Sequence, residues 1–279
     1  MTPPERALHA EARSSLQGDA RGLQQILVNG ASLLGAYVLP RGLTFASALI
    51  AARQLGPERF GAYGTAASYA IIVSILGSLG MLPLLVRELA RTPERALEVL
   101  SAAHIVKAGA TLVMLIVLLA VATLVLHYPT EIVVSAALLG IGYVFSAFAE
   151  NLGAYFQAIE QMHVWLESSI WFGLLSGLLG IALVLLTNSV PLFCVAFACG
   201  QLGALLWLMR RMPHTARGWS ESALADARRL ARAVLPFAAA FLALTIFYKV
   251  DVLLLERLQD RAIVGIYAAG YKLVDIVHA

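Results

Sequence analysis

Long, nearly uninterrupted apolar stretches constrain the fold of this chain more than any other feature of its sequence. Seven of them reach the length of about 20 mostly apolar residues that an α-helix needs to cross a lipid bilayer. They cover approximately residues 26–52, 61–86, 104–126, 132–156, 166–187, 191–209 and 234–256, and an eighth begins near Ala262 and runs to Ala279. Strands of alternating polarity, typical of a membrane β-barrel, do not occur. The sequence therefore predicts an all-α, polytopic transmembrane bundle with seven full spans and a truncated eighth.

The composition agrees with burial in lipid. Only 13% of the 279 residues are charged and the mean hydropathy is +0.80, whereas soluble domains carry about 25% charged residues. The net charge of +3 is too small and too scattered to indicate a nucleic-acid partner. Cys194 and Cys199 would face different directions on one helix, so we expect two buried thiols and neither a disulfide nor a shared metal site.

The loop charges predict the orientation in the membrane. Short links at 127–131 and 188–190 make neighbouring spans antiparallel hairpins. Thirteen cations then share a side with the N-terminus: Arg6, Arg13, Arg21, Arg87, Arg91, Arg95, Lys107, Arg210, Arg211, Arg217, Arg228, Arg229 and Arg232. Only Arg53, Arg59, Arg257 and Arg261 lie on the other side. Because cytoplasmic loops carry the excess of Lys and Arg, the N-terminus is predicted to be cytoplasmic.

The spans divide into two groups of unequal size. The predicted organisation is a cytoplasmic arm without a signal peptide (1–25), a six-helix lobe (26–209), a cytoplasmic linker (210–233) and the start of a second lobe (234–279). The stretch 220–237 has apolar residues separated by arginines, so we expect an amphipathic helix along the headgroups that ends at Pro236. An ordinary solvated linker is the alternative.

An internal similarity relates the openings of the two groups. Gly61-Ala62-Tyr63 in the first corresponds to Gly265-Ile266-Tyr267 in the second, and each follows an apolar segment that contains one cation, Arg41 or Lys249. Two halves that enter the membrane from the same side form a parallel repeat, a common plan of secondary transporters. We therefore expect a pseudo-two-fold axis along the membrane normal.

Five segments carry a resemblance to a known family. They are AARQLGPERFGAYGTA (51–66), LVRELAR (85–91), YFQAIEQ (155–161), LARAVLPF (230–237) and YKVDVLLLERLQDRAIVGIYAAGYKLVD (248–275). In this order they resemble the bacterial lipid-linked oligosaccharide flippases, the polysaccharide-transporter (O-antigen/teichoic acid export) family of the multidrug/oligosaccharidyl-lipid/polysaccharide exporter superfamily. The resemblance covers nearly the whole chain after about residue 22. It implies two lobes around a central cavity, and with it we expect this chain to be an N-terminal fragment.

Charged residues within the spans are the candidate site. A cation at the bilayer centre costs about 2.5–3.5 kcal/mol, so Arg41, Lys249 and Lys272 are expected to face a hydrated cavity or an anionic partner. The resemblance implies that this partner is a lipid diphosphate. Structural pairing is the alternative, and Lys272 lies three residues before Asp275. Asp251 is expected either to pair with a cation such as Arg41 or to carry a coupling H⁺ or Na⁺.

A second group of polar residues lies toward the end of the fourth span. Glu150, Asn151 and Tyr155 are candidate sugar contacts, because carboxylates, amides and aromatic rings suit a carbohydrate surface. The alternative is a helix end that emerges among lipid headgroups.

The sequence contains no phosphate loop, nucleophile elbow or Cys/His metal spacing. With the resemblance, this predicts a transporter rather than an enzyme. It would flip polyprenyl-diphosphate-linked oligosaccharide across the bacterial inner membrane for surface polysaccharide biosynthesis, without a cofactor other than a coupling ion. Expected partners are the bilayer, the lipid-linked glycan, and a glycan polymerase or glycosyltransferases. The alternatives are a peptidoglycan-precursor flippase, a drug/cation antiporter of the same superfamily, and a non-transporting scaffold of a glycan-assembly complex.

Overall fold

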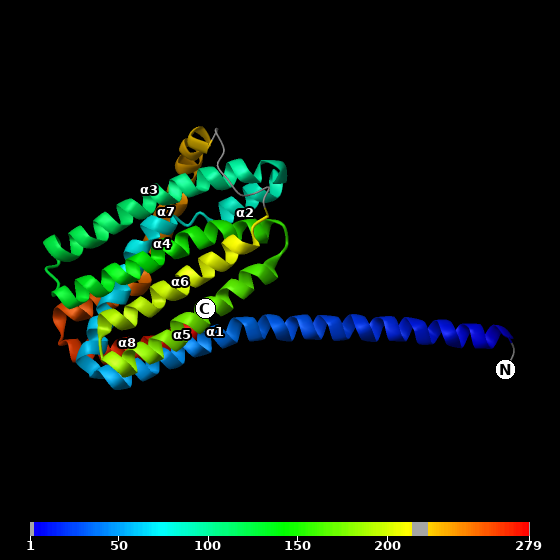
Figure 1. The fold of residues 1–279 in the computed structure, drawn as a ribbon, viewed down its shortest axis with the longest axis horizontal. Coiled ribbons are helices and arrows are strands. Elements are labelled where there is room, and N and C mark those ends of the chain that lie inside the picture. The colour runs from blue at the N-terminus through cyan, green and yellow to red at the C-terminus, as the bar shows by residue number, and fades with distance from the viewer. Residues whose placement is uncertain (1–2, 214–222, 279) are drawn as a thin grey trace.

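The computed structural model describes the backbone of residues 3–213 and 223–278. It describes the side chains of 38, 40–213 and 223–270, apart from 237, 248, 249, 253 and 261. Eight α-helices make up this part of the chain: α1 (Pro3–Ser78), α2 (Leu82–Arg91), α3 (Ala96–Ala120), α4 (Thr130–Ala158), α5 (Met162–Thr187), α6 (Val190–Arg211), α7 (Ala223–Leu258) and α8 (Arg261–His278). A 3₁₀ turn (Pro93–Arg95) precedes α3 and a π-helical turn (Val121–Val125) extends it. The prediction of an all-α chain is confirmed (Figure 1).

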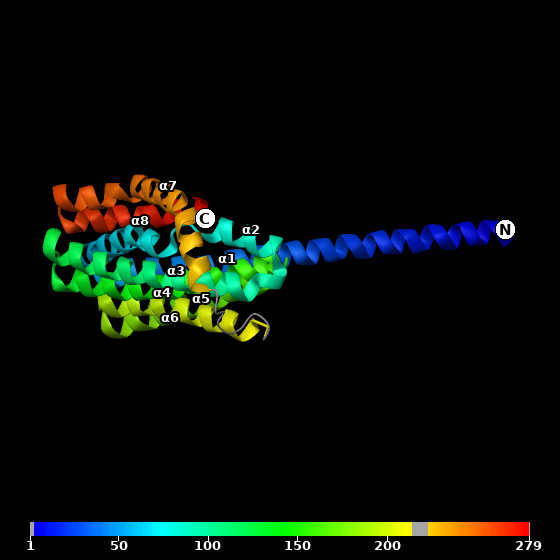
Figure 2. The ribbon, with the colours of Figure 1, turned by 90° about the horizontal axis from the view of Figure 1, so that it is seen from above.

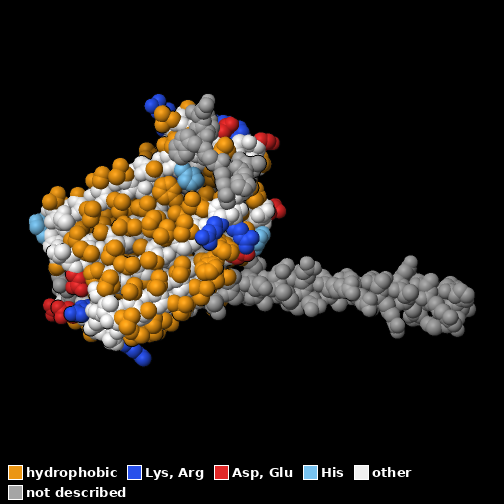
Figure 3. All heavy atoms as spheres, in the orientation of Figure 1, with side chains coloured by type: hydrophobic (Ala, Val, Ile, Leu, Met, Phe, Trp, Pro, Cys, Tyr) orange, Lys and Arg blue, Asp and Glu red, His pale blue; other side chains and the backbone are white. Residues whose placement is uncertain are grey.

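Six described stretches are long and apolar enough to cross a membrane: Pro40–Arg91, Pro93–Val125, Thr130–Ala158, Met162–Thr187, Val190–Arg211 and Ala223–Phe247. Hydrophobic side chains cover the visible face of the bundle, and charged ones gather toward its two ends (Figure 3). This distribution is typical of a multi-pass membrane protein, because the lipid-facing middle of such a bundle must be apolar.

The first of these stretches contains a reversal of the chain. At Gly56 (φ 73°, ψ 171°) the backbone of α1 leaves the helical conformation, and Pro57 follows. A positive φ costs glycine little, which makes a sharp break possible here. The chain turns back at this point (Figure 1), so α1 consists of a first arm (residues 3–55) and a second arm (57–78).

The predicted span 61–86 is not one helix, which corrects the sequence interpretation. The second arm ends at Ser78, Leu79 and Gly80 have positive φ values of 58° and 59°, and α2 begins after this break. A Cβ on Gly80 would collide with the ring of Phe241 of α7. The sequence of this region reads as continuously apolar, so its hydropathy gave no signal of the break.

Contacts near the helix ends show which of these ends lie together. Arg95 Nη2 lies 3.4 Å from Asp226 Oδ2, which joins the start of α3 to the start of α7. At the other end of the bundle, Arg59 Nη1 donates to Asn188 O (2.8 Å) and Arg257 Nη2 donates to Leu126 O (3.0 Å). We call the first the arginine-rich end and the second the opposite end.

Helix α7 continues through the position where a helix end was predicted. It runs from Ala223 to Leu258 with Pro236 inside it. A proline within a helix bends it rather than ending it when the surrounding contacts hold both halves. The first part of α7 crosses the bundle, and the rest lies beside α8 along one side (Figure 2). Residues 214–222 of the predicted linker lie outside the described part of the chain.

Glycines allow the first arm to pack closely on α5. A Cβ at Gly173, Gly177 or Gly180 would collide with Pro40, Leu43 or Ser47, respectively. Such small-residue contacts are the usual means of helix association in membranes, where van der Waals packing replaces the hydrophobic effect. They hold residues 40–47 of the first arm at a fixed depth and rotation.

Candidate functional site

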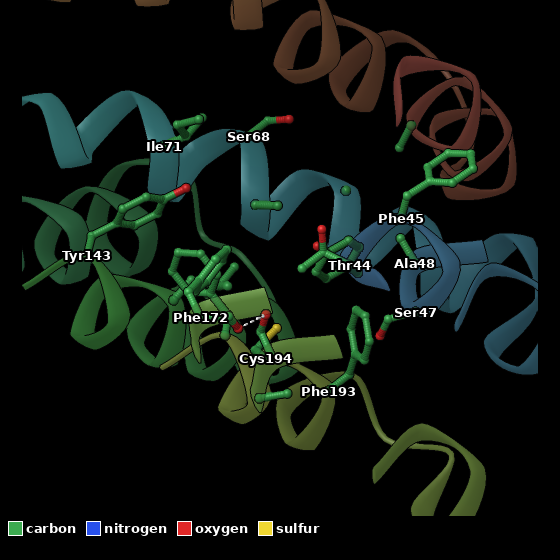
Figure 4. A pocket seen from close by; sticks show the side chains of 18 of the residues that line it. Thr44, Phe45, Ser47, Ala48, Ser68, Ile71, Tyr143, Phe172, Phe193 and Cys194 are labelled. Carbon is green, nitrogen blue, oxygen red and sulfur yellow. Dashed lines mark hydrogen bonds between the residues drawn. The ribbon is translucent and has the colours of Figure 1, made fainter. Parts of the chain in front are cut away.

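A cavity of about 330 Å³ lies among the helices of the bundle. Its lining comes from both arms of α1 and from α4, α5 and α6 (Figure 4). Val252 of α7 and Ala268 of α8 close it on another side. The cavity therefore lies where the first six-helix group meets the two helices that follow it.

The wall of this cavity is mostly apolar, and side chains of α1, α4, α5 and α6 add polar groups to it. They are Arg41, Thr44, Ser47, Tyr63, Ser68, Tyr143, Ser176 and Cys194. Among the described lining residues, Arg41 is the charged one. Ser47 is 2% exposed, and its Oγ has no hydrogen-bond partner in the described part of the chain. A buried hydroxyl without a partner is costly in an apolar environment, so this position suits a polar ligand or water.

The position of Arg41 follows from its neighbours in the first arm. Pro40 packs against Gly173 of α5, and Gly42 has open space on its surface. Thr44 Oγ1 donates to the Arg41 carbonyl oxygen at 3.0 Å. The sequence prediction that Arg41 lines a cavity agrees with this geometry, and its role in binding remains a prediction.

Aromatic rings form much of the apolar wall. Tyr63 and Phe193 meet edge to face with ring centroids 5.1 Å apart. Phe197 contacts Tyr143 at 5.0 Å and Phe172 at 5.8 Å. Each tyrosine supplies an apolar ring and one hydroxyl, a combination that suits an amphipathic ligand.

Glycines bring the second arm of α1 into close contact with α8. A Cβ on Gly265 would collide with the carbonyl of Pro57 and lie 2.9 Å from Gly61 N, and a Cβ on Gly64 would lie 2.7 Å from Ala268 Cβ. We call this contact the glycine seam. The internal similarity pairs Gly61 with Gly265 and Gly64 with Ala268, so equivalent residues of the two copies meet each other. This is the geometry expected on a pseudo-two-fold axis.

A second contact near the seam joins α7 to the turn between α3 and α4. The guanidinium of Arg257 lies 5.6 Å from the ring centroid of Tyr128 and also holds Leu126 O. Burial, together with the nearby Glu256 carboxylate, raises the pKa of Tyr128 to about 12. The two helices of the second group are thus attached to the first group at the opposite end of the bundle.

The other cations predicted for the site lie on α7 and α8. The side chains of Lys249, Lys272 and Asp275 are outside the described part of the chain. Asp251 accepts a 2.6 Å hydrogen bond at Oδ2 from the hydroxyl of Tyr267. The backbone N–H of Val252 donates to the other carboxylate oxygen, Oδ1, at 2.9 Å. Pairing of Asp251 with a cation and its role in ion coupling stay predictions.

Glu150 takes part in a buried ion pair away from the cavity lining. Its Oε2 lies 2.8 Å from Lys107 Nζ of α3, and the hydroxyl of Ser78 donates to the same oxygen at 2.9 Å. Lys107 is 0% exposed. The loop-charge analysis counted Lys107 as a cation of the cytoplasmic side, but it is a bundle residue. The missed signal was a single lysine within an apolar helix, which requires a partner.

The remaining candidate sugar contacts do not join the cavity either. Asn151 is 1% exposed, and neither polar atom of its amide has a partner among the described residues. Tyr155 meets Phe156 edge to face at 5.5 Å. The predicted residues are therefore divided between the cavity and the arginine-rich half of the bundle. Within the described residues, no three His, Cys, Asp or Glu side chains form a metal-binding group.

Comparison with known proteins identifies the family. Residues 26–278 match the family model described as polysaccharide biosynthesis protein. A search of curated proteins finds no match to this sequence. Because the family model covers nearly all of the multi-pass bundle, this chain belongs to the polysaccharide biosynthesis protein family.

Proposed function

We propose that this chain forms the first lobe, and the opening helices of a second, of a transporter that moves polyprenyl-diphosphate-linked oligosaccharide across the bacterial inner membrane. The observation that carries the proposal is the Arg41-lined cavity at the contact between the first helix group and α7 and α8. Membership of a polysaccharide biosynthesis family supports the glycan as cargo.

The chemistry of the cavity suits a lipid-linked diphosphate. A diphosphate that enters the hydrocarbon region loses its hydration, so it needs fixed cations and hydroxyl donors in return. A guanidinium engages phosphate oxygens through two parallel hydrogen bonds, which gives orientation as well as charge. Arg41 supplies this group, and hydroxyls such as Ser47 supply further donors.

The glycine seam supports alternating access. The seam holds the second arm of α1 against α8 near the opposite end of the bundle. If the arginine-rich end faces the cytoplasm, as the loop charges predict, the seam is the contact that we propose to separate the cavity from the outside. Opening of the seam, with closure at the arginine-rich end, would then expose the cavity to the other side.

The cavity suits a cationic drug less well than it suits a diphosphate. A cationic cargo requires carboxylates, and the charged residue among the described lining residues is an arginine. A peptidoglycan precursor carries the same lipid diphosphate as an oligosaccharide precursor. The transport assay below therefore has to identify which glycan is carried.

Substitution of Arg41 in the full-length gene tests the proposal, with surface glycan measured in cells that lack their own flippase. We expect Arg41→Ala to lower export roughly tenfold or more, because one lost charged hydrogen bond of about 1.5–3 kcal/mol corresponds to such a factor. Arg41→Lys should retain part of the activity, and Lys249→Ala should resemble Arg41→Ala.

Arg53→Ala is the matched control, since Arg53 is an exposed arginine near the end of the same arm. Its export and its protein level in the membrane should equal those of the wild type. Full export by an Arg41→Ala, Lys249→Ala double variant would contradict the proposal.

A further inference from the structure

The end of α1 is tied to two other helices through the ammonium group of Lys107. Lys107 Nζ donates to the carbonyl oxygen of Ser78 at 2.8 Å and to Glu150 Oε2 at 2.8 Å. The hydroxyl of Ser78 donates to the same carboxylate oxygen at 2.9 Å. A fully buried cation thus joins α1, α3 and α4 at one point.

Ser78 is the last residue of the second arm, and the helix is broken directly after it. Leu79 and Gly80 both have positive φ, so the carbonyl groups of the last turn lose part of their regular helical partners. Among the described residues, Ser78 O accepts from Lys107 Nζ and, at a long 3.4 Å, from Met81 N. The carbonyl end of a helix also carries a partial negative charge. This position therefore attracts a cation.

The oxygen atoms that surround the ammonium at the break are of the kinds that bind a monovalent cation. In membrane transporters, the carbonyl ends of interrupted helices coordinate Na⁺, often together with a carboxylate. Here the same two kinds of oxygen, Ser78 O and Glu150 Oε2, face a single cation. That cation is covalently part of the chain.

We propose that Ser78 and Glu150 form a monovalent-cation site whose resident cation is the ammonium of Lys107. The site needs one positive charge to hold the break between α1 and α2, and the lysine supplies it without an ion from solution. When the ammonium is removed, Na⁺ or K⁺ occupies the same oxygens. The inference concerns binding and stability, so it stands independently of the cargo proposed above.

The neighbouring titratable group does not compete for these oxygens. His104 lies one turn before Lys107 on α3, and its Nδ1 is 2.6 Å from Leu100 O. Its ring stacks on Phe148 with centroids 5.7 Å apart. His104 therefore does not hold the Glu150 carboxylate, and replacing Lys107 leaves this carboxylate without its cation.

Thermal unfolding of the detergent-purified chain tests the site. The wild type, Lys107→Ala and the Lys107→Ala, Glu150→Gln double variant are compared in NaCl, KCl and choline chloride at equal ionic strength. Choline is too large for the site, so it controls for screening. The double variant is the matched control, because it removes the negative charge that would bind the ion.

For Lys107→Ala we expect Na⁺ or K⁺ to raise Tm by roughly 3–8 °C over choline, with a saturable concentration dependence. The wild type and the double variant should differ by less than about 1 °C between the salts. Equal Tm values of Lys107→Ala in all three salts would overturn the proposal, as would the same ion dependence in the wild type.

The proposal is also contradicted if Lys107→Ala fails to fold at every Na⁺ and K⁺ concentration while the double variant folds. A double variant that itself fails to fold would contradict it too. That result would mean that loss of the charged groups, rather than their imbalance, disrupts the structure.

Discussion

Gly64 of α1 and Ala268 of α8 face each other so closely that a Cβ on the glycine would lie 2.7 Å from that of the alanine. Nearby, a Cβ on Gly265 would lie 2.9 Å from the backbone nitrogen of Gly61 and still closer to the carbonyl of Pro57. The two helices therefore touch through residues that are equivalent in the internal repeat. The contact depends on the absence of side chains, which makes it sensitive to single methyl groups.

Gly265→Ala should destabilise the contact between α1 and α8. The added Cβ would collide with the backbone carbonyl of Pro57, which has little freedom to move, and overpacking of this kind costs roughly 1–3 kcal/mol. Thermal unfolding in detergent measures the effect. Gly270→Ala is the matched control on the same helix, because a Cβ there meets open space. Gly270→Ala should be neutral or stabilising, and an equal loss in both variants would contradict the close contact.

A disulfide across the glycine seam should form readily and stop transport. Gly64→Cys with Ala268→Cys, in a background without Cys194 and Cys199, places the two sulfur atoms within bonding reach after a small shift. If the seam opens during alternating access, oxidation should abolish glycan export and reduction should restore it. The pair Gly64→Cys with Gly270→Cys serves as control. Unchanged export by the cross-linked protein would show that the seam does not open.

Cysteines at the two ends of the bundle test the membrane orientation. Glu94 and Glu131 are both exposed, near the arginine-rich end and the opposite end, respectively. A membrane-impermeant thiol reagent should label Glu131→Cys in intact cells and Glu94→Cys only after lysis. The reverse pattern would invert the topology that the loop charges predict.

Tyr128 should make the attachment of α7 sensitive to alkali. Burial raises its pKa to about 12 in the folded protein from the ordinary value of 10.0. The unfolded chain therefore loses this proton first. The contribution of the neutral Tyr128 phenol to the free energy of unfolding is fully present below pH 10. It declines by roughly 1–3 kcal/mol as the pH rises toward 12. Unfolding between pH 9 and 12 should show a smaller loss for Tyr128→Phe than for the wild type. Identical pH profiles would contradict a buried phenol.

The Arg41 cavity and the Lys107 ion pair show how differently two intramembrane cations are used. Arg41 lines a space that contains hydroxyl groups, whereas the Lys107 ammonium is enclosed by a carbonyl and a carboxylate. Both satisfy the requirement that a charge in a membrane has a polar partner. Of these two cations, Arg41 is the one that lines the cavity.

The sequence by itself determined the class of the protein. Apolar length requires helices that cross a bilayer, because every backbone group in lipid must be bonded within its own segment. That argument needs no tertiary information, and it gave the all-α, multi-pass architecture that the structure has. Five short segments between residues 51 and 275 likewise gave the resemblance to a polysaccharide-transporter family, and residues 26–278 match the polysaccharide biosynthesis protein family.

The tertiary structure alone decided which charges meet. From the sequence, Glu150 was a candidate sugar contact and Lys107 was counted with the loop cations. In the fold, Lys107 Nζ lies 2.8 Å from Glu150 Oε2. The contact of Asp251 with Tyr267 of α8, 2.6 Å across two helices, was likewise not predicted from the sequence. The break after Ser78 was missed because hydropathy does not report backbone dihedrals, although Gly77, Gly80 and Pro83 flank it. Pairing depends on helix rotation and depth, which close helix contacts set, such as that of Gly140 of α4 with Leu118 of α3. Those contacts join residues far apart in the chain, so local sequence patterns do not contain them.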